Sequence, residues 1–218
     1  MGQFDIINTL KILPGIILGL TIHEFCHAYV ALRCGDSTAR DQGRVTLNPI
    51  KHIDPLGFIL LLLVGFGWAK PVQFTESNLR NPRWDVIKIA LAGPFSNALL
   101  SMLLTIVFCT LDFFVARSYD STSVLIREIL IYAIQINWAL FVFNLIPIPP
   151  LDGSHLITHQ LRKYPSLYLG LYKYGTLALF GILMIDSFLK IEILPIMPVI
   201  SFLFTGFYSL VSIVLPVS

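Results

Sequence analysis

The segment ILPGIILGLTIHEFCHAYVAL, residues 12–32, carries the pentad HEFCH inside an otherwise apolar run that is long enough to cross a bilayer. His23 and His27 are four residues apart, so they share one helical face, and Glu24 lies beside them. This pattern is typical of a zinc site in which two imidazoles bind the metal and a glutamate acts as general base. Because ionisable groups at membrane depth are costly, we expect these side chains to face a protein interior and to carry function.

The composition is that of a membrane protein with several spans. Hydrophobic residues make up 56% of the 218 residues and charged residues only 13%, against roughly a quarter in ordinary soluble domains. We therefore expect a single membrane-embedded domain over residues 1–218. The residues before the first apolar run include Asp5 and no basic cluster, so a cleavable signal peptide is not expected. Three cysteines without a CxxC pair favour neither a disulfide framework nor a thiolate zinc site.

Apolar runs bounded by polar connectors predict an all-α polytopic membrane protein with about five transmembrane helices. We expect these helices at approximately residues 4–33, 85–114, 124–146, 167–189 and 195–215. The first three should form a catalytic core within about residues 4–160, followed by the C-terminal helices over about residues 167–215.

A shorter apolar run, Pro55 to Phe66, has too few residues for the roughly 20 that a spanning helix needs. It leads into the glycine-rich stretch GFGWAKPV (residues 65–72) and the strand-like KPVQF. We expect a re-entrant element that returns to the same side, because irregular backbone at depth is tolerated only where it lines a cavity. The alternative is a short, tilted spanning helix, which would invert the topology of the chain that follows.

Two further segments bring polar residues to membrane depth. In AGPFSN (residues 92–97), Gly93 and Asn97 share a face of small residues, which directs Asn97 toward another helix or the site. In NLIPIPPLDG (residues 144–153), three prolines end the helix and leave Asp152 on a non-helical segment. Asp152 is therefore the best candidate for the third protein ligand of a catalytic zinc.

Together these residues predict a hydrolytic site with one Zn²⁺ per chain. The expected metal ligands are His23, His27 and Asp152. Glu24 would take a proton from water activated by the metal, and the resulting hydroxide would attack a peptide carbonyl. Asn97 and Asn144 would donate hydrogen bonds to the oxyanion or to the substrate backbone. The other histidines, His52, His155 and His159, are expected in solvated loops. The alternative is a role near the metal, which for His155 and His159 would be support of its ligands.

The motifs HEFCH, AGPFSN and NLIPIPPLDG, in this order, resemble the three signatures of the site-2 protease family of intramembrane metalloproteases. The segments GRVTLNPIKHIDPLG (residues 43–57) and GWAKPVQF (residues 67–74) are similar to its small bacterial subgroup, which has neither PDZ nor CBS domains. The third motif departs slightly, because LDGSH stands where the family often has LDGGH. The resemblance implies the same zinc ligands, the same catalytic glutamate and the same roles for the two asparagines.

The resemblance also implies a role for GFGWAKPVQF, residues 65–74. This element, which includes Gly65, Phe66 and Gly67, would form a membrane-dipping β-hairpin that binds substrate. Its edge would pair with an unwound substrate helix, because a helical peptide bond is shielded and must be extended before hydrolysis.

Lysines and arginines concentrate on one predicted side of the membrane. This predicts a multi-pass protein of the bacterial plasma membrane with its N-terminus outside. The C-terminus and the HEFCH end of the first helix would be cytoplasmic. The expected partners are the lipid bilayer and a transmembrane peptide or protein substrate. The sequence contains no nucleic-acid-binding motif and does not indicate an oligomeric state.

The expected function is an intramembrane zinc metalloprotease that cleaves peptide bonds within or near transmembrane helices. A membrane zinc or proton transporter would also place histidine and carboxylate in membrane helices. It would not need Glu24, and it would show a second polar cluster on a path to the far side. An inactive scaffold that binds substrate helices would use GFGWAKPVQF but would not require an intact HEFCH and Asp152.

Overall fold

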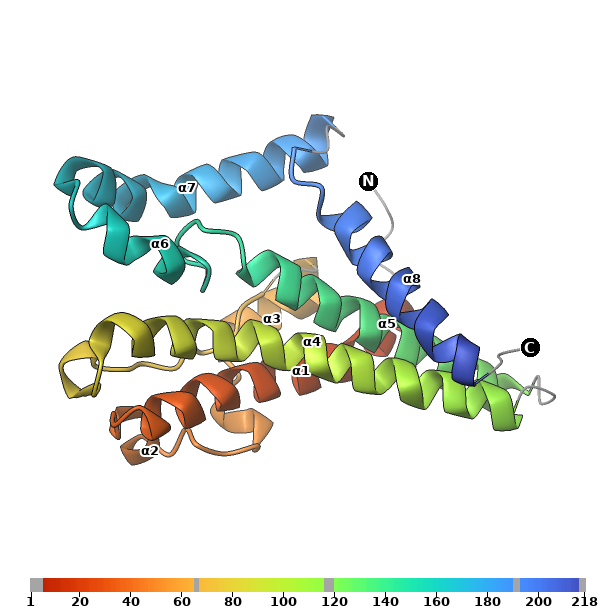
Figure 1. The fold of residues 1–218 in the computed structure, drawn as a ribbon. Coiled ribbons are helices and arrows are strands. Elements are labelled where there is room, and N and C mark those ends of the chain that lie inside the picture. Colours follow the sequence, from red (N-terminus) through yellow and green to blue (C-terminus); the bar gives the residue numbers. More distant parts are fainter. Residues whose placement is uncertain (1–5, 65–66, 116–119, 190–192, 216–218) are drawn as a thin grey trace.

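A computed structural model describes residues 6–64, 67–115, 120–189 and 193–215 (Figure 1). Five long helices in this part of the chain are apolar enough to cross a membrane, as predicted. They are α1 (Ile6–Arg33), α4 (Pro82–Val115), α5 (Ser121–Asn144), α7 (Pro165–Leu189) and α8 (Ile196–Val214). The shorter elements are α2 (Thr38–Asp41), η1 (Pro49–Lys51), α3 (Pro55–Val64), η2 (Glu76–Asn78) and α6 (Ser154–Leu161). The protein is thus an all-helical, multi-pass membrane protein.

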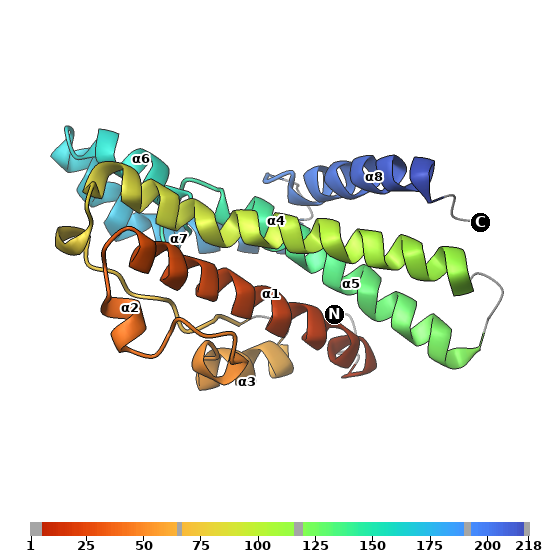
Figure 2. The same cartoon turned by 60° about the horizontal axis from the view of Figure 1, so that its bottom comes forward.

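The helices α1, α4 and α5 form a bundle that Figures 1 and 2 show from two directions. They meet at Asn97 of α4, whose amide donates to Gly19 O of α1 at 3.1 Å and to Asn137 Oδ1 of α5 at 2.9 Å. A Cβ at Gly19 would lie 2.6 Å from Asn137 Oδ1, so a side chain here would displace the amide that accepts from Asn97. Asn137 thus accepts a hydrogen bond that joins α4 to α5.

The C-terminal helices contact the bundle differently. Helix α8 packs on α4 and α5 through a buried apolar cluster that includes Ala98, Trp138 and Ile200. Helix α7 instead lies beside α6 and away from α1 (Figure 1). At Gly175 it approaches the ring of Pro149 in the loop between α5 and α6.

Several helix boundaries differ from the prediction by a few residues, and the short helix α6 was not predicted. Helix α4 begins three residues before the expected Asp85, because proline suits the first turn of a helix. The Asn81 N–H also donates to Asp85 Oδ2 at 2.8 Å and caps this turn. The segment from Ser154 to Leu161, expected as a polar connector, forms α6.

Helix α3 has 10 residues and is absent from the five candidate spans of the described chain. At about 1.5 Å per residue it covers about half of a hydrocarbon core of about 30 Å. This length fits the predicted re-entrant element better than the alternative of a tilted spanning helix.

The predicted β-hairpin is wrong for the part of this element that the structure describes. Residues 67–75, which we call the strap, are extended, and their one β contact is an isolated antiparallel bridge between Ile53 and Ala69. Lys70 N–H donates to His52 O at 2.8 Å beside this bridge. Gly65 and Phe66, which were expected in the hairpin, lie outside the described residues.

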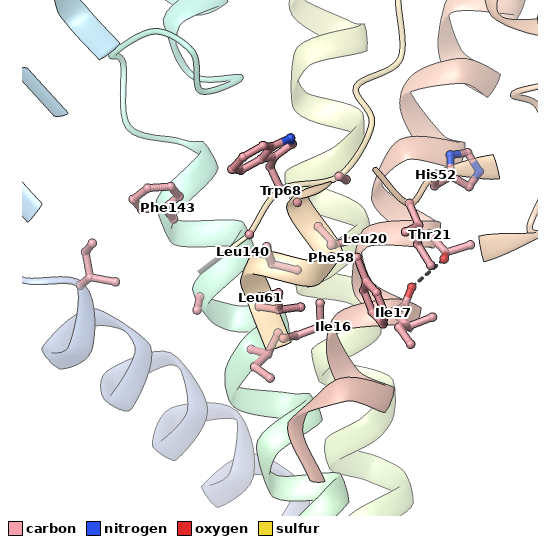
Figure 3. A pocket seen from close by; sticks show the side chains of 17 residues that line it. Ile16, Ile17, Leu20, Thr21, His52, Phe58, Leu61, Trp68, Leu140 and Phe143 are labelled. Carbon is pink, nitrogen blue, oxygen red and sulfur yellow. Dashed lines mark hydrogen bonds between the residues drawn. The ribbon is translucent and has the colours of Figure 1, made fainter. Parts of the chain in front are cut away.

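Local chemistry explains why the pairing stops after one bridge. Asp54 Oδ1 accepts from Gly57 N–H at 2.8 Å and so caps α3, which begins at Pro55. Residues 55–64 are therefore helical and offer no extended backbone to pair with the strap. Within the strap, Pro71 lacks the N–H that a ladder needs. The strap, α1, α3 and α5 instead line an apolar cavity (Figure 3).

Candidate metal centre

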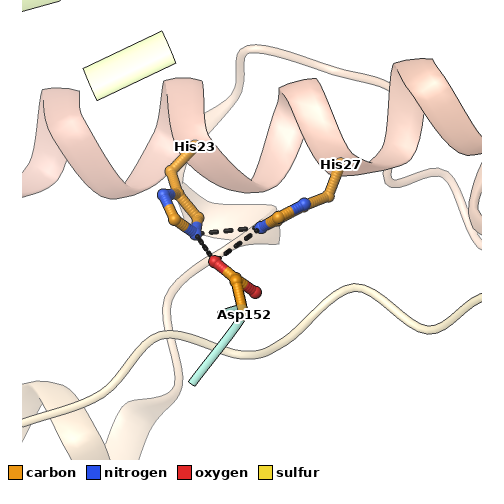
Figure 4. A group of neighbouring side chains, drawn as sticks. All are labelled: His23, His27 and Asp152. Atoms are coloured by element: carbon orange, nitrogen blue, oxygen red, sulfur yellow. Dashed lines mark hydrogen bonds and ion pairs between the residues drawn. The ribbon is translucent and has the colours of Figure 1, made fainter. Parts of the chain in front are cut away.

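The three residues predicted as metal ligands converge in the bundle (Figure 4). His23 and His27 project from α1, and Asp152 reaches them from the loop between α5 and α6. The two Nε2 atoms lie 2.9 Å apart, and Asp152 Oδ2 lies 3.1 Å from His23 Nε2 and 3.3 Å from His27 Nε2. Both histidines are buried, with exposed fractions of 5% and 7%, so solvent does not compensate for this crowding.

The donor set fits a zinc ion. Each ring has its Nδ1 occupied, because His23 Nδ1–H donates to Asn97 Oδ1 at 2.6 Å and His27 Nδ1–H donates to Ile89 O at 2.7 Å. The two Nε2 lone pairs therefore face one another, which is unfavourable without a cation between them. Ligand atoms about 2.0 Å from a tetrahedral zinc lie about 3.3 Å from each other, close to the separations observed here.

The loop between α5 and α6 holds Asp152 in place. Gly153 N–H donates to Asn144 O at 2.7 Å, and Leu151 N–H donates to Ile148 O at 3.0 Å, so the loop folds back on the end of α5. Asp152 Oδ2 is buried and has no hydrogen-bond donor among the described residues. A buried carboxylate oxygen aimed at two imidazole lone pairs is well suited to bind a divalent cation.

Gly93 of α4 lies directly against the ligand nitrogens. A Cβ at this position would be 2.3 Å from His27 Nε2 and 2.6 Å from His23 Nε2. A side chain here would therefore occupy the space between the ligands. The motif AGPFSN thus contributes its glycine to the centre as well as its asparagine.

Asn97 connects the metal centre to the helix bundle. Its side chain is fully buried, and its Oδ1 accepts from His23 while its Nδ2 donates to Gly19 O and Asn137 Oδ1. Asn137 is held in turn by its own Nδ2, which donates to Ala133 O at 2.8 Å. Both amide hydrogens of Asn97 are therefore in use, and its geometry is that of a residue that orients a metal ligand.

Glu24 lies beside the ligands but is not one of the three converging groups. Its side chain is 8% exposed, and its Oε2 accepts a hydrogen bond from Val72 N–H at 2.8 Å. The strap thus passes directly over the predicted general base. A carboxylate that accepts a backbone N–H is held in one orientation next to the metal centre.

Residues outside the long helices fix the strap on either side of Val72. Arg44, which is 4% exposed, donates through Nη2 to Lys70 O, and Asp36 Oδ2 accepts from Thr75 N–H at 2.8 Å. Burial alone would raise the pKa of Asp36, but hydrogen bonds from Thr38, Asn78 and Thr75 lower it below its usual range. The strap is therefore tied to two buried charges as well as to Glu24.

Asn144 and Gly67 are not among the three side chains of the ligand cluster. Asn144 ends α5, and its Nδ2 donates to Leu140 O at 2.9 Å within the same helix. Gly67 begins the described part of the strap and lines the apolar cavity. The oxyanion or substrate-binding roles of Asn97, Asn144 and Gly67 stay predictions.

The expectation of a solvated loop is wrong for His52, which is 1% exposed. Its Nε2–H donates to Thr46 O at 2.8 Å, and its Nδ1 has no hydrogen-bond partner in the described chain. His155 is half-buried in α6 with its ring centroid 6.0 Å from that of Phe74. The side chain of His159 lies outside the part that the structure describes.

The comparisons with known proteins agree with this geometry. Residues 12–182 match the model of a protein family described as peptidase family M50. The chain is 42% identical over 142 residues to "Putative zinc metalloprotease YwhC" of Bacillus subtilis, which covers 65% of each chain. It is 30% identical over 156 residues to "Putative zinc metalloprotease Rip2" of Mycolicibacterium smegmatis, covering 69% of this chain and 57% of the relative.

An archaeal relative, "Putative zinc metalloprotease MJ0611" of Methanocaldococcus jannaschii, is 30% identical over 156 residues, covering 71% of this chain and 73% of its own. No solved structure matches the chain. The family match includes all three converging side chains and Glu24. The chain therefore belongs to peptidase family M50, the site-2 protease family of zinc metalloproteases.

Proposed function

We propose that this protein is an intramembrane zinc endopeptidase that hydrolyses peptide bonds within or near transmembrane helices of membrane-protein substrates. The observation that carries the proposal is the convergence of His23, His27 and Asp152 beside Glu24 in a bundle of membrane helices. When bound, one Zn²⁺ per chain would polarise the scissile carbonyl and make water acidic enough to lose a proton near neutral pH.

The residues of the chain transfer the proton and orient the metal ligands. Glu24 accepts the proton of the attacking water and returns it to the leaving amine. Asn97 and Ile89 O fix the two rings so that both Nε2 lone pairs are free to bind the zinc ion that these residues would hold. The low exposure of all these groups excludes bulk water, which strengthens every electrostatic interaction in the site.

The substrate is proposed to be a single-span or multi-span membrane protein that unwinds at the strap. The strap is extended and offers few ladder partners of its own, so an extended peptide can lie along it. We further propose the bacterial plasma membrane as the location, with the N-terminus outside and the metal centre toward the cytoplasm. The excess of lysine and arginine on that side supports this orientation.

The test is cleavage of a panel of single-span substrates by purified protein in detergent or liposomes. Wild-type protein should cut at least one substrate, the cut should map within or near its membrane span, and a zinc chelator should stop it. Glu24→Gln should bind zinc as well as wild type and lose at least about 10³-fold in rate, since the proton acceptor is gone. Retained cleavage by Glu24→Gln would refute the assignment of the base.

The same preparation separates the two alternatives. A transporter needs a second polar site, whereas the described residues contain one group of three or more metal-binding side chains. Zinc flux in liposomes that is equal in wild type and Glu24→Gln, without cleavage by either, would favour transport. Substrate binding without cleavage by zinc-loaded wild type would favour a scaffold.

A further inference from the structure

A cavity of about 400 Å³ lies between α1, α3, α5 and the strap (Figure 3). Its walls are mostly apolar side chains, among them Leu20, Phe58, Leu61 and Phe143. Its volume falls in the range of ligand sites, which is about 300–1,000 Å³. The cavity is outside the ligand cluster, so the proposed hydrolysis does not by itself explain it.

Helical geometry places this cavity beside Glu24. Ile17, Leu20 and Thr21 line the cavity from α1, and residues spaced by three, four and seven positions share one helical face. Glu24 continues that face one turn further, about 5 Å along the axis. The strap also leads from the cavity to Glu24, because Ala69 lines the cavity and the Val72 N–H donates to Glu24. A group in the cavity is therefore adjacent to the proposed catalytic base.

One residue of the cavity lining also has a buried polar atom without a hydrogen-bond partner in the described chain. His52 lines the cavity and is 1% exposed, and its Nδ1 has no hydrogen-bond donor among the described residues. Its Nε2–H is committed to Thr46 O, so Nδ1 carries the lone pair and acts as acceptor. Burial lowers the pKa of His52 from its usual value, which keeps the ring neutral. An occupant that supplies an N–H would remove this unpaired acceptor.

We propose that the cavity is a substrate subsite that takes a bulky apolar side chain, Leu or Phe, flanking the scissile bond. On binding, the ring of His52 would turn toward the cavity, so that an N–H of the same extended peptide donates to Nδ1, which is buried in the structure without a peptide. This inference rests on the proposed endopeptidase function. A lipid acyl chain would fill the apolar volume but brings no donor for His52, whereas an unwound peptide brings both groups. His52 is thus a binding residue and takes no part in bond cleavage.

The first experiment measures side-chain preference. Single-span substrates carry Ala, Leu, Phe or Trp at each of the three positions on either side of the cut. At one position wild type should prefer Leu or Phe over Ala by about tenfold or more in kcat/KM, because the cavity buries the whole side chain. The substitution Ala139→Phe, which narrows the cavity from α5, should reduce that ratio toward one. Phe143→Ala, which widens it, should shift the preference toward Trp.

A matched control and a folding check accompany these variants. Val124→Phe adds bulk to an exposed position of the same helix and should leave the preference unchanged. Zinc content reports whether each variant folds around its metal centre. Since Ala139→Phe and Phe143→Ala are expected to change the preference in opposite directions, a general loss of stability does not imitate the result.

The second experiment tests the acceptor. Methylation of the substrate amide that donates to His52 should cost wild type about three- to tenfold in kcat/KM, the usual net value of one hydrogen bond. The same methylation should cost His52→Phe nothing, because that variant has no acceptor. A purely structural role for His52 would give equal costs in both proteins.

A binding readout is independent of turnover. Glu24→Gln protein is incubated with a substrate that carries p-benzoylphenylalanine at the preferred position, and crosslinks should map to Leu61, Phe143 or the strap. Crosslinks elsewhere, or an unchanged preference in both cavity variants, would overturn the subsite while leaving the protease intact. A co-purified lipid that blocks the crosslink at every substrate concentration would also overturn it. Absence of cleavage by wild type would instead refute the proposed function.

Discussion

Val72 N–H donates a hydrogen bond to Glu24 Oε2 over 2.8 Å, so a backbone amide of the strap lies on the predicted general base. The two residues are 48 positions apart in the sequence. Hydrogen bonds to charged groups are worth about 1.5–3 kcal/mol net, enough to hold an extended segment in a defined position. The contact thus joins the strap to Glu24.

We expect this contact to protect the strap from hydrogen exchange. In Glu24→Ala the acceptor is lost, so the Val72 amide should exchange about 10- to 100-fold faster than in wild type. Glu24→Gln keeps an oxygen acceptor and should retain most of the protection. Hydrogen–deuterium exchange of a peptide that covers residues 67–75 measures both. Equal exchange in Glu24→Ala and wild type would show that Glu24 does not hold the strap.

Gly93→Ala should abolish zinc binding. The new methyl group would lie 2.3 Å from His27 Nε2 and 2.6 Å from His23 Nε2, where the ligands leave no room for it. The matched control is Gly206→Ala in α8, because a Cβ there has nothing within 4 Å. Metal content of the two purified variants, measured by elemental analysis, checks the prediction. Stoichiometric zinc in Gly93→Ala would mean that the helices α1 and α4 can separate at this point.

Substitutions of Asn97 distinguish ligand orientation from oxyanion stabilisation. Asn97→Ala removes the acceptor of His23 Nδ1–H and should weaken zinc binding by about 10- to 100-fold. Asn97→Asp keeps that acceptor and should bind zinc more tightly than Asn97→Ala. Competition with a chromogenic chelator gives both affinities. A fall in kcat at unchanged zinc affinity would instead support the oxyanion role.

Asp36 should make stability depend on pH in the acidic range. Its pKa is lowered in the folded protein from the usual value of 3.8 by hydrogen bonds, against the effect of burial. Its contribution is therefore complete above that unfolded-state value and is lost as pH falls through the lower folded pKa. The difference in thermal midpoint between wild type and Asp36→Asn should be constant at about pH 5–7 and shrink below about pH 4.

The effect of Asp36→Asn on stability at neutral pH can be compared with that of a neighbouring substitution. At neutral pH Asp36→Asn should lower the free energy of unfolding by about 1–3 kcal/mol, because the buried carboxylate accepts several hydrogen bonds. Asp41→Asn, on an exposed neighbouring carboxylate, should have much less effect. A difference that grows as the pH falls would contradict the proposed role of Asp36.

The long helices could be predicted because membrane spans depend on composition over some 20 residues. The convergence of His23, His27 and Asp152 could be predicted because two ligands share one helical face and the third follows a proline-broken helix. The absence of a hairpin in the described part of residues 65–74 could not be predicted from the sequence. It depends on the capping of α3 by Asp54 and on the missing N–H of Pro71.

Contacts between distant segments could not be predicted from the sequence either. The signal for Gly93 was its place four residues before Asn97, which marked a small face but not the imidazoles that it meets. His52 stands in a polar stretch, and nothing in its neighbours predicted burial against Thr46 O. Val72 acts through its backbone N–H, which every residue except proline possesses, so no side-chain pattern could indicate it.

The single amide of Asn97 binds Gly19 O, Asn137 Oδ1 and His23 Nδ1, so one side chain ties three helices to a metal ligand. A solubilising agent that separates α4 from α1 breaks the hydrogen bond that orients the ring of His23. Zinc retention during extraction therefore reports the intactness of the helix contacts. A detergent screen can be ranked by metal content alone, before any substrate is known.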